Sequence, residues 1–152
     1  MSETLKAVAL GASYFAVVLA AVGSAFGIGA AGQAAIGAWK KCYQQGKSAQ
    51  FLLLALVSAP LSQTIYAVIQ MILMNGKIND AANAKNLIAY ILIGVFGGIA
   101  QMVSAGWQGK CAANGCVAFA ETDKGFANYL MVLGIVETCA IFALIMAIMA
   151  MQ

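Results

Sequence analysis

The sequence predicts an all-α membrane protein with four transmembrane helices arranged as two tandem hairpins. Hydrophobic residues make up 63% of the chain and charged residues 9%, whereas about a quarter of the residues of a soluble domain are charged. Four stretches carry no charge apart from one glutamate in the last, and each exceeds the roughly 20 residues that a spanning helix needs: residues 7–39, 48–76, 86–109 and 125–152. We therefore expect one membrane domain, residues 1–152, with hairpins over about 5–75 and 86–151.

The first stretch contains the segment GSAFGIGAAG, residues 23–32, in which small residues recur every three or four positions. In lipid, this spacing lets helix backbones pack closely. Gly27, Gly29 and Gly32 also satisfy the G-x-G-x-x-G pattern, but a dinucleotide site needs a strand before the glycines. The stretch is also longer than the apolar region of a signal peptide, which has about 7–15 residues. We expect a retained spanning helix with a close-packed interface.

The second stretch holds the only proline, Pro60, which removes one backbone hydrogen bond and frees a carbonyl in the preceding turn. Ala59, Ser62, Gln63 and Tyr66 surround it at spacings i, i+3, i+4 and i+7, so they share one helix face. Any one of these polar groups alone would be expected to join neighbouring helices. Their grouping on one face of a spanning helix favours a site.

Glu137 lies near the middle of the fourth stretch. A charge at that depth costs about 2.5–3.5 kcal/mol, and a chain that keeps an acid there usually binds a cation or a proton with it. The alternative is a neutral, hydrogen-bonded structural acid. Gln101 lies close to the middle of the third stretch, so we expect it at the depth of Glu137, Ser62 and Gln63. Together they would offer the oxygen ligands that a small, hard cation prefers.

Other chemistry is limited by the composition. The chain has no histidine, which excludes imidazole catalysis and the commonest ligand of transition metals. Its four cysteines show neither zinc-site nor disulfide spacing, so we expect free thiols. The net charge of +3 is not clustered in a way that suggests nucleic acid binding. We expect no catalytic residues and no bound cofactor.

The lysines predict the orientation of the chain, because cytoplasmic loops carry an excess of basic residues. Five lysines fall on the side of the first and third connections, and three fall on the side of the N-terminus and the middle connection. This bias favours cytoplasmic first and third connections and both termini outside. The five are Lys40, Lys41, Lys47, Lys110 and Lys124.

The two hairpins resemble each other when one is shifted along the other. At an offset of 76 residues, Ser62 aligns with Thr138 and Tyr66 with Phe142. Glu137 then aligns with Leu61, so the first hairpin repeats the scaffold without the acid. We expect one titratable site for every four helices.

Four motifs in order resemble the rotor proteolipid of V-type or A/V-type ATPases, which is known as subunit K or the c-type proteolipid. They are the Gly-rich first helix, APLSQTIY at residues 59–66, GIAQ ending at Gln101, and VET around Glu137, and the resemblance covers essentially the whole chain. It implies a homo-oligomeric ring, without catalytic residues, that a cytoplasmic ATPase head turns through a central stalk touching the cytoplasmic loops. It also implies that Glu137 exchanges its ion beside an arginine of the stator subunit, in a membrane that is expected to be a prokaryotic cell membrane.

The sodium-translocating members of that family imply a set of ligands. Their glutamate corresponds to Glu137, and the glutamine of their third helix corresponds to Gln101. Their Thr-Gln pair after the proline corresponds to Ser62 and Gln63, and the carbonyl before the proline is that of Ala59. Their tyrosine corresponds to Tyr66, which would be a hydrogen-bond partner of Glu137. Serine in place of threonine preserves the hydroxyl, whereas Leu61 replaces a small residue. We expect Na⁺ to be transported, with H⁺ as the alternative.

Two other classes of membrane protein are alternatives to a rotor proteolipid. A proton-coupled small multidrug transporter also has four short helices around an intramembrane glutamate. Its binding chamber would need aromatic side chains near the acid, whereas Gly134, Val136 and Thr138 flank Glu137. A structural four-helix membrane protein would not need polar residues at one depth on three helices.

Overall fold

The computed structural model describes residues 2–152, and these residues form helices joined by short connections. Four of its continuous helical segments are long and apolar enough to cross a membrane: Glu3–Gln44, Leu53–Asn79, Leu87–Thr122 and Phe126–Ala150. This confirms the predicted all-α fold with four spanning helices. The individual elements are α1 (Ser2–Gln44), α2 (Leu53–Ser58), η1 (Ala59–Leu61), α3 (Ser62–Asn79), η2 (Ala81–Asn86), α4 (Leu87–Thr122) and α5 (Phe126–Ala150).

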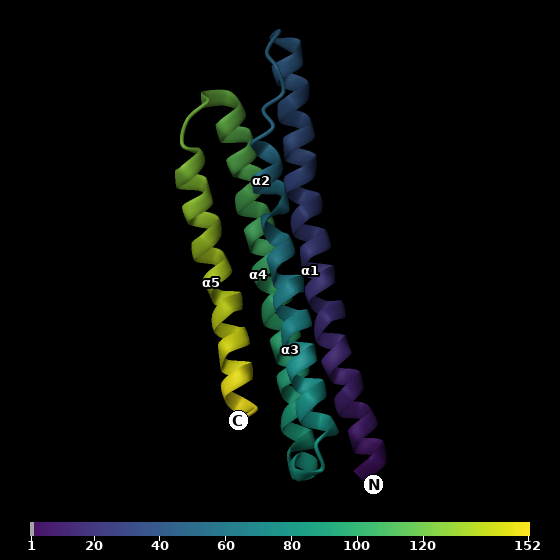
Figure 1. Ribbon diagram of the computed structural model, residues 1–152. Helices are drawn as coiled ribbons and strands as arrows, with labels where there is room; N and C mark the ends of the chain where they lie inside the picture. The colour runs from purple at the N-terminus through teal and green to yellow at the C-terminus, as the bar shows by residue number, and fades with distance from the viewer. Residues whose placement is uncertain (1) are drawn as a thin grey trace.

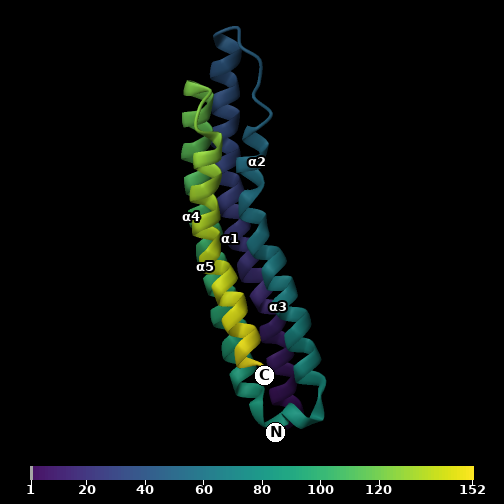
Figure 2. The ribbon, with the colours of Figure 1, turned by 60° about the vertical axis from the view of Figure 1, so that its left-hand side comes forward.

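The helices form an elongated bundle in which consecutive spanning helices run in opposite directions, so that α1 and α4 run the same way (Figure 1). α1 packs along α4, whereas α5 contacts α4 and α3, so that α1 and α5 lie on opposite sides of the bundle. The N-terminus, the C-terminus and the α3–α4 connection lie toward one end in both views (Figure 2). At the other end, Lys41 Nζ lies 2.7 Å from Glu121 Oε1, and Gln50 of the first connection donates to Asp123 of the third. The first and third connections therefore share one end of the molecule.

Glycines bring the backbones of α1 and α4 into contact, as the small-residue spacing predicted. A Cβ atom added to Gly23 or Gly27 would collide with the backbone of α4, and one added to Gly109 would collide with the backbone of Gly27. Only glycine allows this approach. Gly29, by contrast, faces open space, so the interface uses only part of the glycine-rich segment.

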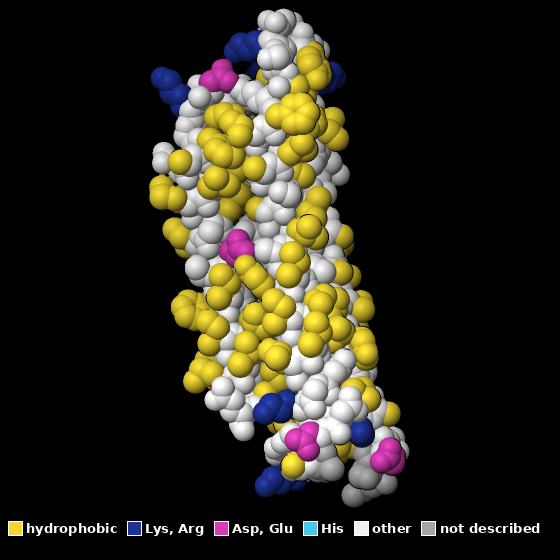
Figure 3. All heavy atoms as spheres, viewed as in Figure 1, with side chains coloured by type: hydrophobic (Ala, Val, Ile, Leu, Met, Phe, Trp, Pro, Cys, Tyr) yellow, Lys and Arg dark blue, Asp and Glu magenta, His cyan; other side chains and the backbone are white. Residues whose placement is uncertain are grey.

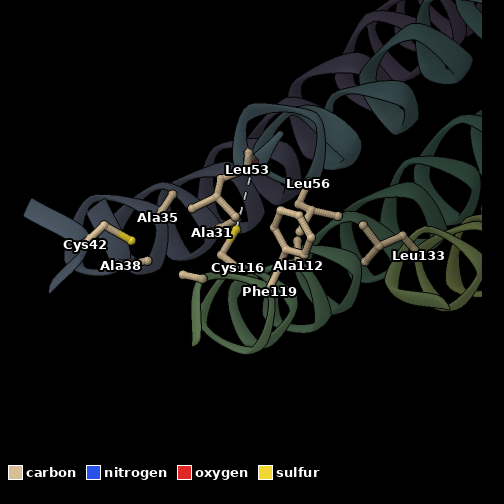
Figure 4. Packing of buried hydrophobic residues seen from close by; sticks show 11 residues of the cluster. Ala31, Ala35, Ala38, Cys42, Leu53, Leu56, Ala112, Cys116, Phe119 and Leu133 are labelled. Atoms are coloured by element: carbon tan, nitrogen blue, oxygen red, sulfur yellow. Dashed lines mark hydrogen bonds between the residues drawn. The ribbon is translucent and has the colours of Figure 1, made fainter. Parts of the chain in front are cut away.

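A cluster of small and apolar side chains joins the two hairpins near the end that holds the first and third connections (Figure 4). Ala31, Ala35 and Ala38 recur on one face of α1 and leave room for larger side chains from α2 and α4, such as Leu56. The four cysteines are free thiols, as expected: Cys42, Cys111, Cys116 and Cys139. This packing fixes the position of α2, and therefore of Pro60, which follows it and begins the site described below.

The third spanning helix is longer than the sequence predicted. We expected the third connection to carry Lys110, but α4 continues to Thr122 and includes Lys110. The Lys110 ammonium lies 4.2 Å from the centre of the Trp107 ring, so that an aromatic face stabilises the charge on the helix. The charge therefore did not mark the end of the helix, and the true third connection is short.

Candidate ion-binding site

The second spanning segment is broken at Pro60, where the sequence predicted a disturbed backbone. A 3₁₀ turn, η1, separates α2 from α3 at this point, because proline cannot donate the backbone hydrogen bond that an α-helix requires. The Ala59 carbonyl accepts a hydrogen bond from the backbone N–H of Ser62 and one of 3.2 Å from its Oγ. The break thus places the Ala59 carbonyl and the Ser62 hydroxyl together.

The carboxylate of Glu137 on α5 is held by donors from two other helices. Tyr66 of α3 donates its hydroxyl to Oε1 at 2.6 Å, and Gln108 of α4 donates Nε2 to Oε2 at 3.2 Å. The Glu137 side chain is half-buried. Figure 3 shows an acidic side chain about midway along an otherwise largely apolar face, between the charged ends of the molecule. Both carboxylate oxygens are therefore oriented by hydrogen bonds at mid-height of the bundle.

Two fully buried glutamines connect the carboxylate to the break at Pro60. Gln63 Nε2 donates to Gln108 Oε1 at 2.9 Å and to Ser104 Oγ at 3.2 Å. Ser62 Oγ lies 3.2 Å from Gln63 Oε1, and Gln108 Nε2 also donates to the Leu133 carbonyl at 3.0 Å. The result is a continuous network of polar groups contributed by α3, α4 and α5. Of the residues singled out from the sequence, Glu137, Tyr66, Gln63, Ser62 and Ala59 all belong to it.

Gln101 lies elsewhere. Its Nε2 donates to the Ala140 carbonyl of α5 at 3.1 Å, and its buried Oε1 has no hydrogen-bond donor among residues 2–152. The amide that reaches Glu137 belongs to Gln108, seven residues further along α4. Residues seven apart share a helix face but lie about 10 Å apart along the axis. The sequence thus predicted the correct face of α4 but placed the contact with the site of Glu137 two helical turns away from Gln108, where it occurs.

Gln108 and Ser104 are the residues that sequence reasoning missed. A signal for them was present, because Gln101, Ser104 and Gln108 recur at i, i+3 and i+7 and so form one polar face on a spanning helix. Ser104 donates to the Val136 carbonyl at 3.2 Å, next to Glu137 in sequence. This face packs on the equally polar face of α3.

The charge of the site restricts what it can bind. Glu137 is the one carboxylate among the hydrogen-bonded side chains of the network, and the described residues hold no group of three or more His, Cys, Asp or Glu that could bind a metal ion. A single carboxylate balances one positive charge, and an unbalanced charge at membrane depth is costly. The site is therefore suited to a proton or to one monovalent cation held by oxygen atoms.

The second hairpin resembles a known protein family. Residues 91–150 match the family model of the ATP synthase C subunit. The matched segment includes most of α4, the whole of α5, and Gln101, Gln108 and Glu137. No curated protein matches the chain. The hairpin that carries the half-buried carboxylate is thus similar to the C subunit of ATP synthase, a similarity that supports a c-type membrane proteolipid.

Proposed function

We propose that this chain is the ion-carrying subunit of the rotor ring of a V-type ATPase, in the duplicated, four-helix form called subunit K. The observation that carries the proposal is the mid-height carboxylate of Glu137, which Tyr66 and Gln108 orient within a polar shell from three helices. The similarity of residues 91–150 to the ATP synthase C subunit supports it. The chain would be a non-catalytic membrane subunit, because ATP hydrolysis or synthesis would take place in the cytoplasmic head.

The proposed cargo is Na⁺, with H⁺ as the alternative. A proton site needs only a carboxyl group, and every additional buried oxygen then requires its own hydrogen-bond partner. Here the carboxylate is accompanied by hydroxyl, amide and carbonyl oxygens, which a cation could satisfy together. The proposed ligand set is Glu137, Ser62, Gln63 and the Ala59 carbonyl, with Gln108 in the role first expected for Gln101 and with Tyr66 as the partner of Glu137.

In the proposed ring, α1 and α4 would line the inside and α3 and α5 would face outward. Close backbone contact between α1 and α4 supports this order, because the inner circumference is the more crowded. Glu137 would then reach an arginine of the stator subunit on the outer side. The shared end of the first and third connections would be cytoplasmic and would meet the central stalk. An electron micrograph of the purified protein that showed no ring would contradict this assembly.

The test of the site is the reaction of Glu137 with a hydrophobic carbodiimide, which modifies protonated carboxyl groups in membranes. We expect millimolar Na⁺ to slow the labelling near neutral pH, because a cation and a proton compete for the same carboxylate. Potassium at the same ionic strength is the matched control for salt, and Glu137→Gln should abolish the labelling. If labelling depended on pH alone and ignored Na⁺, the site would carry protons. If Glu137→Gln were labelled like the natural protein, the proposed site itself would be refuted.

A further inference from the structure

Two glutamines on facing helices have amide oxygens without a hydrogen-bond partner. Gln70 of α3 and Gln101 of α4 are both fully buried, and the Oε1 atom of each has no donor among residues 2–152. A buried acceptor without a donor is costly, because it has given up its hydrogen bonds to water and gained none in return. Two such atoms in one part of the bundle point to a donor that the chain itself does not supply.

The two glutamines lie at a similar level of the bundle. Gln63 of α3 donates to Gln108 of α4 at 2.9 Å, and these two helices run in opposite directions (Figure 1). Gln70 is seven residues after Gln63, and Gln101 is seven residues before Gln108. Both displacements therefore run about 10 Å toward the α3–α4 connection, and seven residues are close to two full turns. Gln70 and Gln101 thus keep the facing sides of α3 and α4.

The contacts of each amide support this arrangement. Gln70 Nε2 donates to the Ile93 carbonyl of α4 at 3.0 Å, and a Cβ atom added to Gly97 would come within 2.7 Å of Gln70 Oε1. Gln101 is one turn beyond Gly97, and helical side chains lean toward the N-terminus of their own helix, which for Gln101 is toward Gly97. Gln101 Nε2 donates to the Ala140 carbonyl of α5 at 3.1 Å. The two amides therefore lie within about one helical turn of each other, where α3, α4 and α5 meet.

The donor must be small and uncharged. Both side chains have no exposed surface in the single chain, so a side chain of another subunit cannot reach them. A cation would bring a positive charge to two neutral amides, and an unbalanced charge at membrane depth is costly. Each amide nitrogen is held by a backbone carbonyl, so neither glutamine can turn its nitrogen toward the other without losing that bond. A water molecule is small and neutral, and its two O–H donors match the two acceptors.

We propose that a water molecule binds where α3, α4 and α5 meet, and that it donates one hydrogen bond to Gln70 Oε1 and one to Gln101 Oε1. Buried waters satisfy polar groups that the chain leaves unpaired, and they are costly to remove. This water joins α3 to α4 and, through the bond from Gln101 to Ala140, to α5. It therefore holds α5, which carries Glu137, against α3, which carries Tyr66. The water site does not depend on which ion Glu137 carries.

The neighbouring Met74 can report on this water. Its side chain is fully buried, and its Sδ lies 3.8 Å from Gln70 Nε2. Short X-ray pulses split water into hydroxyl radicals at the place where the water lies, and oxidation converts methionine to its sulfoxide. We expect mass spectrometry of the full-length protein in phosphatidylcholine vesicles to show oxidation of Met74, although bulk solvent does not reach it. A Met74 that stays unoxidised would overturn the proposal.

Two variants show whether the oxidation comes from the proposed water. Gln101→Leu removes one of its acceptors and should abolish the oxidation of Met74. Thr64→Val is the matched control, because it removes the 2.8 Å hydrogen bond from Thr64 of α3 to Ser24 of α1 but neither acceptor of the water. It should leave the oxidation unchanged. An unchanged or higher rate in Gln101→Leu, or an equal loss in Thr64→Val, would mean that the radicals arise elsewhere, and the proposal would be wrong.

Melting temperatures test whether the two glutamines share a ligand. Gln70→Leu and Gln101→Leu should each lower the melting temperature of the purified protein by about 2–4 °C, the shift that the loss of one hydrogen bond causes in a chain of this length. The double variant should lower it by less than the sum of the two shifts, because either substitution alone already breaks the bridge. Additive shifts would contradict the proposal.

Discussion

Replacement of Gln108 by methionine tests the ion site at the residue that the structure adds to it. Methionine has nearly the same length as glutamine but can neither donate nor accept a strong hydrogen bond. Gln108→Met would remove the 3.2 Å bond to Glu137 and the 2.9 Å bond from Gln63. It would leave the carboxylate with the Tyr66 hydroxyl as its one hydrogen-bond donor among the described residues.

The size of the effect follows from these bonds. A hydrogen bond to a charged group contributes about 1.5–3 kcal/mol, which corresponds to a factor of roughly 10 to 150 in an equilibrium constant. The bond to Glu137 is long for a charged pair, and the carboxylate is only half-buried. The lower end of the range applies. We expect the Na⁺ concentration that protects half of Glu137 from carbodiimide to rise about tenfold.

The matched control is Gln101→Met on the same face of α4. Gln101 donates to a backbone carbonyl of α5 and makes no hydrogen bond to Glu137, so this variant should change the protecting concentration by less than about threefold, the effect of a weak neutral bond. If Gln101→Met weakened protection more than Gln108→Met did, the cation would be held two turns away from the observed network, and the reasoning from the structure would be refuted.

Three further predictions concern the same site, the interface between α1 and α4, and the orientation of the chain. Tyr66→Phe removes a 2.6 Å hydrogen bond to the carboxylate and should weaken Na⁺ protection about tenfold in the same labelling assay; unchanged protection would mean that the tyrosine only packs. Gly27→Ala places a Cβ against the backbone of α4 and should lower the melting temperature of the purified protein by about 2–8 °C, whereas Gly29→Ala, which faces open space, should not. Cys42 is only 3% exposed and would be a poor topology probe, but Gln45→Cys lies on the exposed first connection and should react with an impermeant thiol reagent from the cytoplasmic side only.

The fold could be predicted because its cause is local. Long uncharged stretches determine where helices can cross a bilayer, since every backbone polar group there must be paired within the helix. The break at Pro60 was predictable for the same reason, because proline lacks the donor wherever it occurs. The face shared by Ser62, Gln63 and Tyr66 followed from helical spacing alone, and the structure keeps these residues together.

The depth of the contact on α4 could not be predicted in this way. The uncharged stretch ends before Lys110 and has its middle near residue 98, whereas α4 continues to Thr122 and has its middle near Ser104, about seven residues later. The longer helix moves the expected contact toward Gln108. A lysine need not end a helix, because its side chain can point out of the bundle, and the Lys110 ammonium lies against the Trp107 ring. Depth also depends on how α4 slides against α5, and that register is determined by packing between helices.

The two charges within the bundle face opposite directions, and the rotation of α4 about its axis explains how both can persist. An ammonium that faced Glu137 would form an ion pair with it and would compete as a tethered cation with any ion the carboxylate could bind. Because Gln108 and Lys110 are two residues apart, α4 directs a neutral amide to the carboxylate, and the ammonium lines an open groove between α1 and α4 on the other side. The glycine contacts with α1 hold α4 in this rotation, since Gly109, which lies between Gln108 and Lys110 in sequence, packs against Gly27. The close packing of α1 and α4 therefore keeps the Lys110 ammonium away from Glu137.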